Sequence, residues 1–99
     1  MNEAEFSIMV EGASILVKLR GEIDLETSPQ LVACLSVLRS SAIVDCSGLD
    51  FIDSSGIRAF MQAHKDFRAR GDRLTLRNLP PLVQRVFDVA GVLVIFDIE

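Results

Sequence analysis

Apolar and polar side chains alternate over two short stretches near the start of the chain, residues 6–10 and 15–19. A period of two is typical of a strand with one face buried and the other in water. Residues 11–13 between them include a glycine and are enough only for a turn. We therefore predict two strands joined as an antiparallel hairpin, with the second strand ending at Gly21.

The spacing of apolar residues becomes helical after Thr27. Ser28 is a favourable N-cap residue, and Pro29 suits the first helical position because the N–H that it lacks would be unsatisfied there. We predict that this helix ends at residues 40–41. Its apolar face comprises Leu31, Cys34, Leu35 and Leu38.

A second helix is predicted after Gly56, downstream of a short strand. Residues 42–44 form a continuous apolar run, which is typical of a central strand covered on both faces. We expect the helix to be closed by Gly71, because a glycine often follows the last helical turn. The predicted apolar stripe of the helix comprises Ile57, Phe60, Met61, His64 and Phe67.

The last third of the chain predicts two strands with a helix between them. Residues 74–76 and 93–96 are the strands, and Pro80 and Pro81 open the helix, which Gly91 ends. The predicted apolar face of this helix comprises Leu82, Val86 and Val89 or Ala90. The whole order, β-β-α-β-α-β-α-β, predicts a single α/β domain over residues 1–99. We expect a mixed, mostly parallel sheet of about four to five strands with helices packed on it.

Composition and charge narrow the classes of function. Of the 99 residues, 49% are hydrophobic and 24% are charged, as in a globular domain, and the formal net charge is −4. Direct nucleic-acid binding needs a basic surface, so with this net charge we do not expect it. The apolar run at residues 89–96 is far shorter than the ~20 residues that span a bilayer, and residues 1–5 do not resemble a signal peptide. We expect a cytoplasmic protein without membrane insertion.

The two cysteines, Cys34 and Cys46, fit a reducing compartment. Neither belongs to a C-x-x-C pair, and the single histidine cannot complete a zinc site with them. We interpret both as small buried hydrophobic side chains rather than as a redox pair.

Candidate chemistry is concentrated in the block Asp53-Ser54-Ser55-Gly56. It places two hydroxyls and a carboxylate at the predicted first turn of the second helix. Unpaired backbone N–H groups and the positive end of the helix dipole favour an anion at such a point. A serine here can be a plain helix cap, or it can carry a phosphate.

No self-sufficient active site is indicated. A serine nucleophile needs a base within hydrogen-bond reach, yet His64 follows Ser54 by ten residues, about 15 Å along a helix. The chain contains neither a G-x-S-x-G elbow nor a G-x-x-x-x-G-K-[ST] loop. Asp45, Asp50 and Asp53 could hold a divalent cation, but acidic residues are common at strand ends. We therefore predict that the chain is not an enzyme, has no cofactor or metal, and acts by being bound.

Three blocks together resemble the anti-sigma factor antagonists of the STAS domain family. The first is Gly21-Glu22-Ile23-Asp24 after the second strand, and the second is Asp53-Ser54-Ser55-Gly56 at the second helix. The third is the segment 79–91, LPPLVQRVFDVAG, with its Phe-Asp pair and closing glycine. The resemblance extends from about Phe6 to Ile95.

This resemblance implies partner switching. In the family, an anti-sigma factor that is also an ATP-dependent serine kinase holds a sigma factor inactive, and the unphosphorylated antagonist binds the kinase and frees the sigma factor. The kinase, which uses ATP and Mg²⁺, phosphorylates the first serine of the D-S-[ST]-G block, and a PP2C-type phosphatase removes the phosphate. Carried over, Ser54 is the phosphoacceptor and Ser55 is a minor alternative. Asp24, Asp53 and Gly56 lie with them in the predicted partner-binding surface.

The resemblance leaves three points open. Arg58, also placed in the partner-binding surface, could pair with a phosphate on Ser54 or be a solvated surface arginine. Stand-alone domains of the family also serve as non-switching scaffold subunits of lipid-transport ABC systems or of stress-sensing assemblies. Whether the chain forms a weak homodimer, and which sigma factor, stimulus and phosphatase it meets, is not readable from the sequence.

Overall fold

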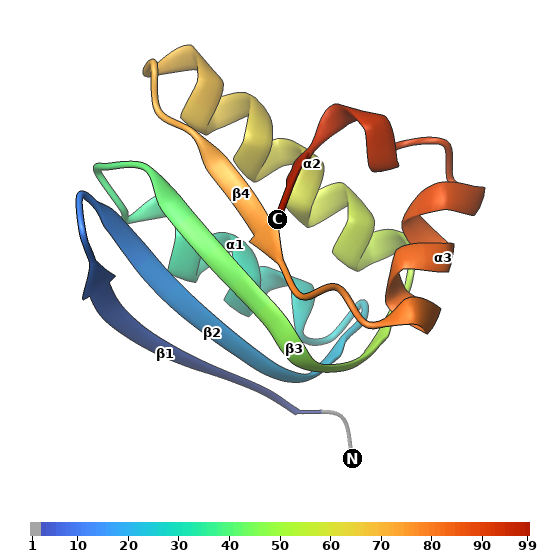
Figure 1. The fold of residues 1–99 in the computed structure, drawn as a ribbon. Helices are drawn as coiled ribbons and strands as arrows, with labels where there is room; N and C mark the ends of the chain where they lie inside the picture. The colour runs from blue at the N-terminus through green and yellow to red at the C-terminus, as the bar shows by residue number, and fades with distance from the viewer. Residues whose placement is uncertain (1–2) are drawn as a thin grey trace.

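The chain forms one five-stranded mixed sheet in the strand order β1-β2-β3-β4-β5 (Figure 1). The structure is a computed structural model that describes residues 3–99. β1 and β2 are antiparallel, and every later pair of neighbouring strands is parallel. The strands are β1 (Ala4–Glu11), β2 (Ser14–Ile23), β3 (Ala42–Ile52), β4 (Leu74–Arg77) and β5 (Asp97–Ile98). The predicted hairpin and mostly parallel α/β sheet are thus confirmed.

Within residues 3–99, three α-helices and one short 3₁₀ helix complete the fold. They are α1 (Ser28–Ser36), α2 (Ser54–Ala69), α3 (Pro81–Val89) and the 3₁₀ helix η1 (Leu93–Ile95). Figure 1 shows α1 and α2 behind the sheet and α3 beside the first turns of α2. The covered face of the sheet carries the core, because alternate residues of the central strands are buried there. These residues include Val17, Leu19, Val44, Cys46, Leu74 and Leu76.

β3 is much longer than predicted. Residues 42–44 are only its first three residues, and the strand continues to Ile52, which pairs with Ile23 at the end of β2. The polar side chains of Asp45 and Ser47 concealed the continuation, because they alternate with the buried Val44 and Cys46. The strand therefore runs almost to Ser54, the first residue of α2.

The predicted last strand at residues 93–96 is wrong. Leu93–Ile95 form η1, in which the Ile95 N–H donates to the Val92 carbonyl at 3.0 Å, and the strand follows at Asp97–Ile98. The turn brings Phe96 into the core, where its ring lies 5.4 Å from that of Phe87 and 6.5 Å from that of Phe60 between centroids. The apolar run at residues 93–96 is thus a helical turn followed by a core residue, whereas its sequence predicts a strand.

The start and end of α1 also differ from the prediction. The N-cap is Thr27 rather than Ser28, and the helix ends at Ser36, well before residues 40–41. The Thr27 hydroxyl does not cap the helix, since its oxygen accepts instead from the Asp24 N–H at 2.8 Å. The predicted apolar face is largely confirmed: Leu31, Leu35 and Leu38 are buried and Cys34 is half-buried.

The apolar stripe of α2 is confirmed except at one position. Ile57, Phe60 and Phe67 are buried, whereas Met61 is 36% exposed. His64 is half-buried with its ring 5.4 Å from that of Phe96, which agrees with an interpretation as a core-edge histidine. After the C-cap Arg70, Gly71 has φ +81° and closes the helix as predicted.

α3 buries a face that shares only the half-buried Val86, which packs against the core, with the predicted one. Val83 and Phe87 face the core, whereas Leu82 is 76% exposed and Val89 is 79% exposed. The rings of Phe87 and Phe60 are 5.9 Å apart between centroids. Both faces of α3 have apolar residues at helical spacing, so periodicity alone could not select the buried one. The larger aromatic side chain of Phe87 fills the core instead.

Candidate functional site

The first turn of α2 is capped by Asp53. Its backbone is extended, and its side-chain Oδ1 accepts hydrogen bonds from the backbone N–H groups of Ser55 at 2.8 Å and Gly56 at 3.3 Å. The cap that a serine could have supplied is therefore supplied by a carboxylate. Within residues 3–99, the hydroxyls of Ser54 and Ser55 make no hydrogen bond to the protein.

The two serines differ in accessibility. Ser54 is exposed, whereas Ser55 is half-buried. A kinase must reach the hydroxyl oxygen of its substrate, so the exposed side chain is the better placed of the two. The positive end of the α2 dipole lies beside this hydroxyl and favours negative charge there.

Gly56 holds the start of α2 against the ends of β2 and β3. A Cβ at this position would lie 2.5 Å from Cγ1 of Ile52 and 2.7 Å from Cγ2 of Ile23. The Asp53 N–H also donates to the Ile23 carbonyl at 3.2 Å. These contacts fix the position of the first turn of α2 at the carboxyl ends of two neighbouring strands.

Asp24 organises the loop that follows β2. Its Oδ1 accepts hydrogen bonds from the N–H groups of Glu26 at 3.0 Å and Thr27 at 3.1 Å and from the Thr27 hydroxyl at 3.0 Å. Only 8% of the residue is exposed. Asp24 directly follows Ile23, whose side chain lies against Gly56 in the first turn of α2. The Asp24 carboxylate accepts hydrogen bonds from the N–H groups of its own loop.

Ser54 and Ser55 open onto different grooves on either side of α2. Ser54 lines a groove of about 540 Å³ between α2 and α3, here called the α2–α3 groove. Ser55 lines a second groove, of about 590 Å³, between α1 and α2, here called the α1–α2 groove. The α2–α3 groove is lined by Ser54, Ile57, Leu82, Arg85, Val86, Val89 and Ala90.

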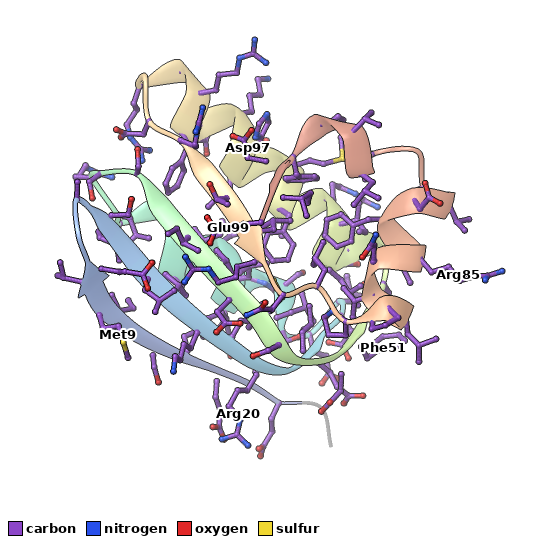
Figure 2. All side chains as sticks on the ribbon, viewed as in Figure 1. Met9, Arg20, Phe51, Arg85, Asp97 and Glu99 are labelled. Atoms are coloured by element: carbon purple, nitrogen blue, oxygen red, sulfur yellow. The ribbon has the colours of Figure 1, made fainter. Side chains whose placement is uncertain are left out.

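Arg58 is exposed on α2, as predicted, but it lines the α1–α2 groove together with Ser55. The arginine that shares a groove with Ser54 is Arg85, which was not singled out in the sequence. Figure 2 shows Arg85 extended away from α3 into solvent. Nothing in the linear pattern indicates this neighbour, because 31 positions separate Arg85 from Ser54.

Exposed apolar side chains surround the two serines. Phe51, three positions before Ser54, is 46% exposed and lies near the start of α3 in Figure 2. Leu25, which lines the α1–α2 groove, is 76% exposed, and Leu82 and Val89 line the α2–α3 groove. Such a concentration of apolar side chains around a polar centre is typical of a protein-binding surface.

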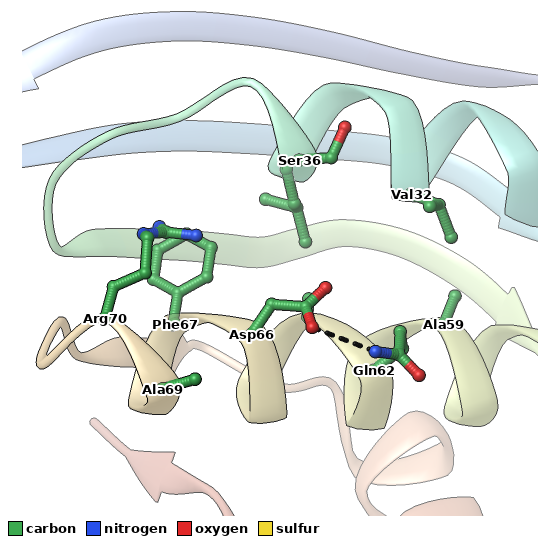
Figure 3. Close-up of a pocket in the computed structure, with 10 residues that line it drawn as sticks. Val32, Ser36, Ala59, Gln62, Asp66, Phe67, Ala69 and Arg70 are labelled. Atoms are coloured by element: carbon green, nitrogen blue, oxygen red, sulfur yellow. Dashed lines mark hydrogen bonds between the residues drawn. The ribbon is translucent and has the colours of Figure 1, made fainter.

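The α1–α2 groove continues away from the serines along α2 (Figure 3). There Gln62 donates to the Asp66 carboxylate at 2.9 Å, and the Arg70 guanidinium lies over the Phe67 ring, 4.5 Å from its centroid. This region has an apolar floor and a volume of about 260 Å³. Its charged side chains are already engaged within the protein, so we place the functional centre at the serines.

The proposed metal ligands do not come together. Asp45 accepts from the Ser47 N–H at 3.0 Å and from the Asn78 amide at 3.3 Å, on β3 and away from Asp53. In the part of the chain that the structure describes, no group of three histidine, cysteine or acidic residues could hold a metal ion.

The two cysteines are free thiols. Burial, together with the nearby Asp45 carboxylate, raises the pKa of the Cys46 thiol to about 12, and burial also raises the pKa of Cys34. A raised pKa keeps a thiol protonated and unreactive near neutral pH.

No helix within residues 3–99 is both long and apolar enough to cross a membrane.

A family model described as "Mlab, STAS domain" matches residues 6–95. The chain is similar to the anti-sigma-B factor antagonist of Listeria monocytogenes, with 32% identity over 83 residues, 80% of this chain and 73% of that protein. It is also similar to the anti-sigma-B factor antagonist of Bacillus subtilis, with 31% identity over 88 residues, 86% of this chain and 81% of that protein.

Among solved structures, the chain resembles that of the Bacillus cell fate determinant SpoIIAA in the phosphorylated form. The TM-score is 0.72 and the sequence identity 25%, over 96% of this chain and 91% of that chain.

Proposed function

The chain belongs to the STAS domain family, and from that membership we propose that it is an anti-sigma factor antagonist. In its unphosphorylated state it binds an anti-sigma factor that is also a serine kinase, and this binding frees a sigma factor. Phosphorylation of Ser54 ends the binding. The similarity over most of the chain to two proteins named anti-sigma-B factor antagonist carries the proposal.

In this function the chain is a substrate and a binding partner rather than a catalyst. The Ser54 Oγ attacks the γ-phosphorus of ATP held with Mg²⁺ by the kinase, the bond from that phosphorus to the β–γ bridging oxygen breaks, and ADP leaves. The hydroxyl proton passes to a base on the kinase. A PP2C-type phosphatase reverses the modification with water and releases inorganic phosphate.

The exposure of Ser54 and its place at a capped helix start support its role as the acceptor. A phosphate adds roughly −1.5 to −2 charge near neutral pH. In the free protein the helix N-terminus stabilises this charge by ~0.3–1 kcal/mol. Modification therefore leaves the fold intact.

In a complex, the same phosphate would lose its water beside the Asp53 carboxylate. An unpaired buried charge costs several kcal/mol, and about 1.4 kcal/mol changes affinity tenfold. A single phosphate can therefore lower affinity about a thousandfold without a change of fold.

The apolar side chains around Ser54 supply the area for docking. Leu25, Phe51, Leu82 and Val89 are exposed in the free protein and would be covered in the complex. Asp24 contributes by holding the loop that carries Leu25. We place the protein in the cytoplasm with its kinase and phosphatase.

The first test is phosphopeptide mass spectrometry on the protein isolated from its native cells. Trypsin should release residues 40–58 as one peptide, and fragmentation distinguishes Ser54 from Ser55 and the other serines. Phosphate on Ser54 that changes with growth state is the expected result. A peptide without phosphate under every growth condition would contradict the proposal and favour a non-switching scaffold in a lipid-transport or stress-sensing assembly.

Ser54→Ala tests the acceptor directly. This variant should bind the kinase in the presence of ATP and remain bound, because it cannot be modified, and its phosphate incorporation should be lost. Ser55→Ala is the matched control at the next residue, and it should keep normal incorporation. Normal phosphate incorporation into Ser54→Ala would refute the assignment.

A further inference from the structure

The α2–α3 groove contains one hydroxyl and one cation in otherwise apolar surroundings. Of the seven residues that line it, Ser54 and Arg85 are the two polar ones, and no carboxylate lines the groove. The α1–α2 groove, which Ser55 lines, holds Arg58 together with Ser28 and Gln62. Each serine thus shares a groove with a different arginine.

Arg85 has no partner among the residues that the structure describes. It forms no ion pair or hydrogen bond with any residue between positions 3 and 99, and its side chain extends into solvent in Figure 2. Other arginines, such as Arg70 and Arg77, are engaged with carboxylates. An exposed, unpaired guanidinium can therefore turn toward a new anion in its groove without breaking an existing ion pair.

We propose that Arg85, rather than Arg58, pairs with a phosphate on Ser54 and that this pair closes the α2–α3 groove. The inference rests on the phosphorylation proposed above. A guanidinium presents two parallel N–H groups that match two phosphate oxygens. The other residues that line the groove, among them Ile57, Val86 and Val89, are apolar, so no described lining residue offers a carboxylate that would compete with the phosphate for Arg85.

The pair adds a second effect to the charge of the phosphate. An Arg85 side chain drawn toward Ser54 lies across the groove and covers part of Leu82 and Val89, which are exposed in the unmodified protein. A partner that uses this groove then loses apolar contact area as well as meeting a dianion. Phosphorylation acts on shape and on charge at the same place.

The test uses the full chain with phosphoserine incorporated at position 54 during synthesis, so that no kinase is needed. Phosphorus NMR then follows the second ionisation of the phosphate, whose pKa is ordinarily about 6. Pairing with a cation favours the dianion and lowers this pKa. Replacing Arg85 by Gln should raise the apparent pKa by roughly half a unit or more, and Arg85→Lys should fall between the two.

Arg58→Gln is the matched control, because Arg58 is an exposed arginine one helical turn after Ser54 that lines the α1–α2 groove instead. It should raise the phosphate pKa clearly less than Arg85→Gln does. Methyl resonances of Leu82 and Val89 should follow the phosphate titration in the parent phosphoprotein and lose this dependence in Arg85→Gln.

An unchanged phosphate pKa in Arg85→Gln would overturn the inference, and so would an equal or larger shift in Arg58→Gln. Because the phosphate is built in, the titration reports on Arg85 whether or not a cellular kinase modifies Ser54. Failure of the proposed function would appear separately, as an unmodified tryptic peptide from native cells.

Discussion

At the scale of single residues, Asp53 and Ser54 have different roles in the first turn of α2. The carboxylate of Asp53 satisfies two backbone N–H groups, so the Ser54 hydroxyl is left free and exposed. The sequence located this block correctly but left open whether a serine was the cap. That choice depends on side-chain rotamers and on the extended backbone of Asp53, and neither follows from residue type alone.

Replacing Asp53 by Ala should lower the free energy of unfolding by about 0.5–2 kcal/mol, because the cap of α2 is lost. Urea denaturation measures this change. Asp50→Ala is the control, since Asp50 is an exposed carboxylate in the same segment without a capping role, and it should change stability little. Equal losses in the two variants would contradict the assignment of the cap.

The raised pKa of Cys46 predicts that the free energy of unfolding falls at alkaline pH. Its pKa is raised to about 12 in the folded protein from an ordinary value of 9.0. Above pH 9 the unfolded chain releases the thiol proton while the folded protein retains it. Stability should therefore decline between pH 9 and about 12, by up to about 1.4 kcal/mol per pH unit from this group.

The check is the slope of the unfolding free energy against pH in Cys46→Ala, compared with that of the parent chain. The chain has no tyrosine to titrate in the same range, so the slope should become shallower in the variant. An identical slope would show that Cys46 is not protonated in the folded state at high pH.

At the scale of elements, the sequence of α3 predicts where the helix begins and ends but not which face is buried. The limits of the helix were well predicted from Pro80, Pro81 and Gly91, because these residues act locally. Its buried face was predicted wrongly, because two apolar faces compete and the choice depends on the aromatic cluster that receives Phe87. The error concerns function, since the exposed face with Leu82 and Val89 lines the groove beside Ser54.

The junction of α2 with the sheet predicts the effect of Gly56→Ala. The added methyl would lie 2.5 Å from Ile52 and 2.7 Å from Ile23, so the helix start must move or the two side chains must shift. We expect a loss of about 1–3 kcal/mol in the free energy of unfolding, measured by chemical denaturation.

Ser55→Ala is the neighbouring control, because it removes a half-buried hydroxyl without adding volume. It should be close to neutral in the same measurement. If Gly56→Ala unfolds like the parent chain, the first turn of α2 is less tightly held than the structure indicates.

At the scale of the whole molecule, the fold was predictable because the order of elements restricts the possible topologies. Strands separated by helices give parallel neighbours, and the short first connection gives the antiparallel pair. Contacts between residues distant in the sequence were not predictable. Arg77, at the end of β4, pairs with Glu11 of β1 at 2.9 Å and with Glu99 near the end of the chain.

The ion pairs of Arg77 with Glu11 and Glu99 predict that the stability of the fold decreases at acidic pH. The hydrogen bond from Arg77 holds the pKa of Glu11 below its ordinary value of 4.5, and the charge of Arg77 acts in the same direction. The contribution of Glu11 to stability is therefore present above that pH and is lost as pH falls through the lowered pKa. Glu11→Gln should flatten the acid limb of the stability curve, measured by thermal unfolding at several pH values below 5.

The matched control is Glu5→Gln, which removes an exposed carboxylate from the same strand. Its acid limb should stay close to that of the parent chain. A high salt concentration should reduce the difference between parent and Glu11→Gln, because the pair is solvent-exposed. Salt-independent curves would argue against an electrostatic origin.

The strand order β1-β2-β3-β4-β5 has a consequence for how the protein is made. Each strand lies beside the strand that precedes it in the chain, so a nascent polypeptide can extend the sheet in the order in which its residues leave the ribosome. No early strand waits for a late one to be inserted between it and its neighbour. Ser54 and its cap are synthesised once β2 and β3 are available, and Arg85 follows about thirty residues later. The surface around Ser54 is therefore completed only when α3 has emerged.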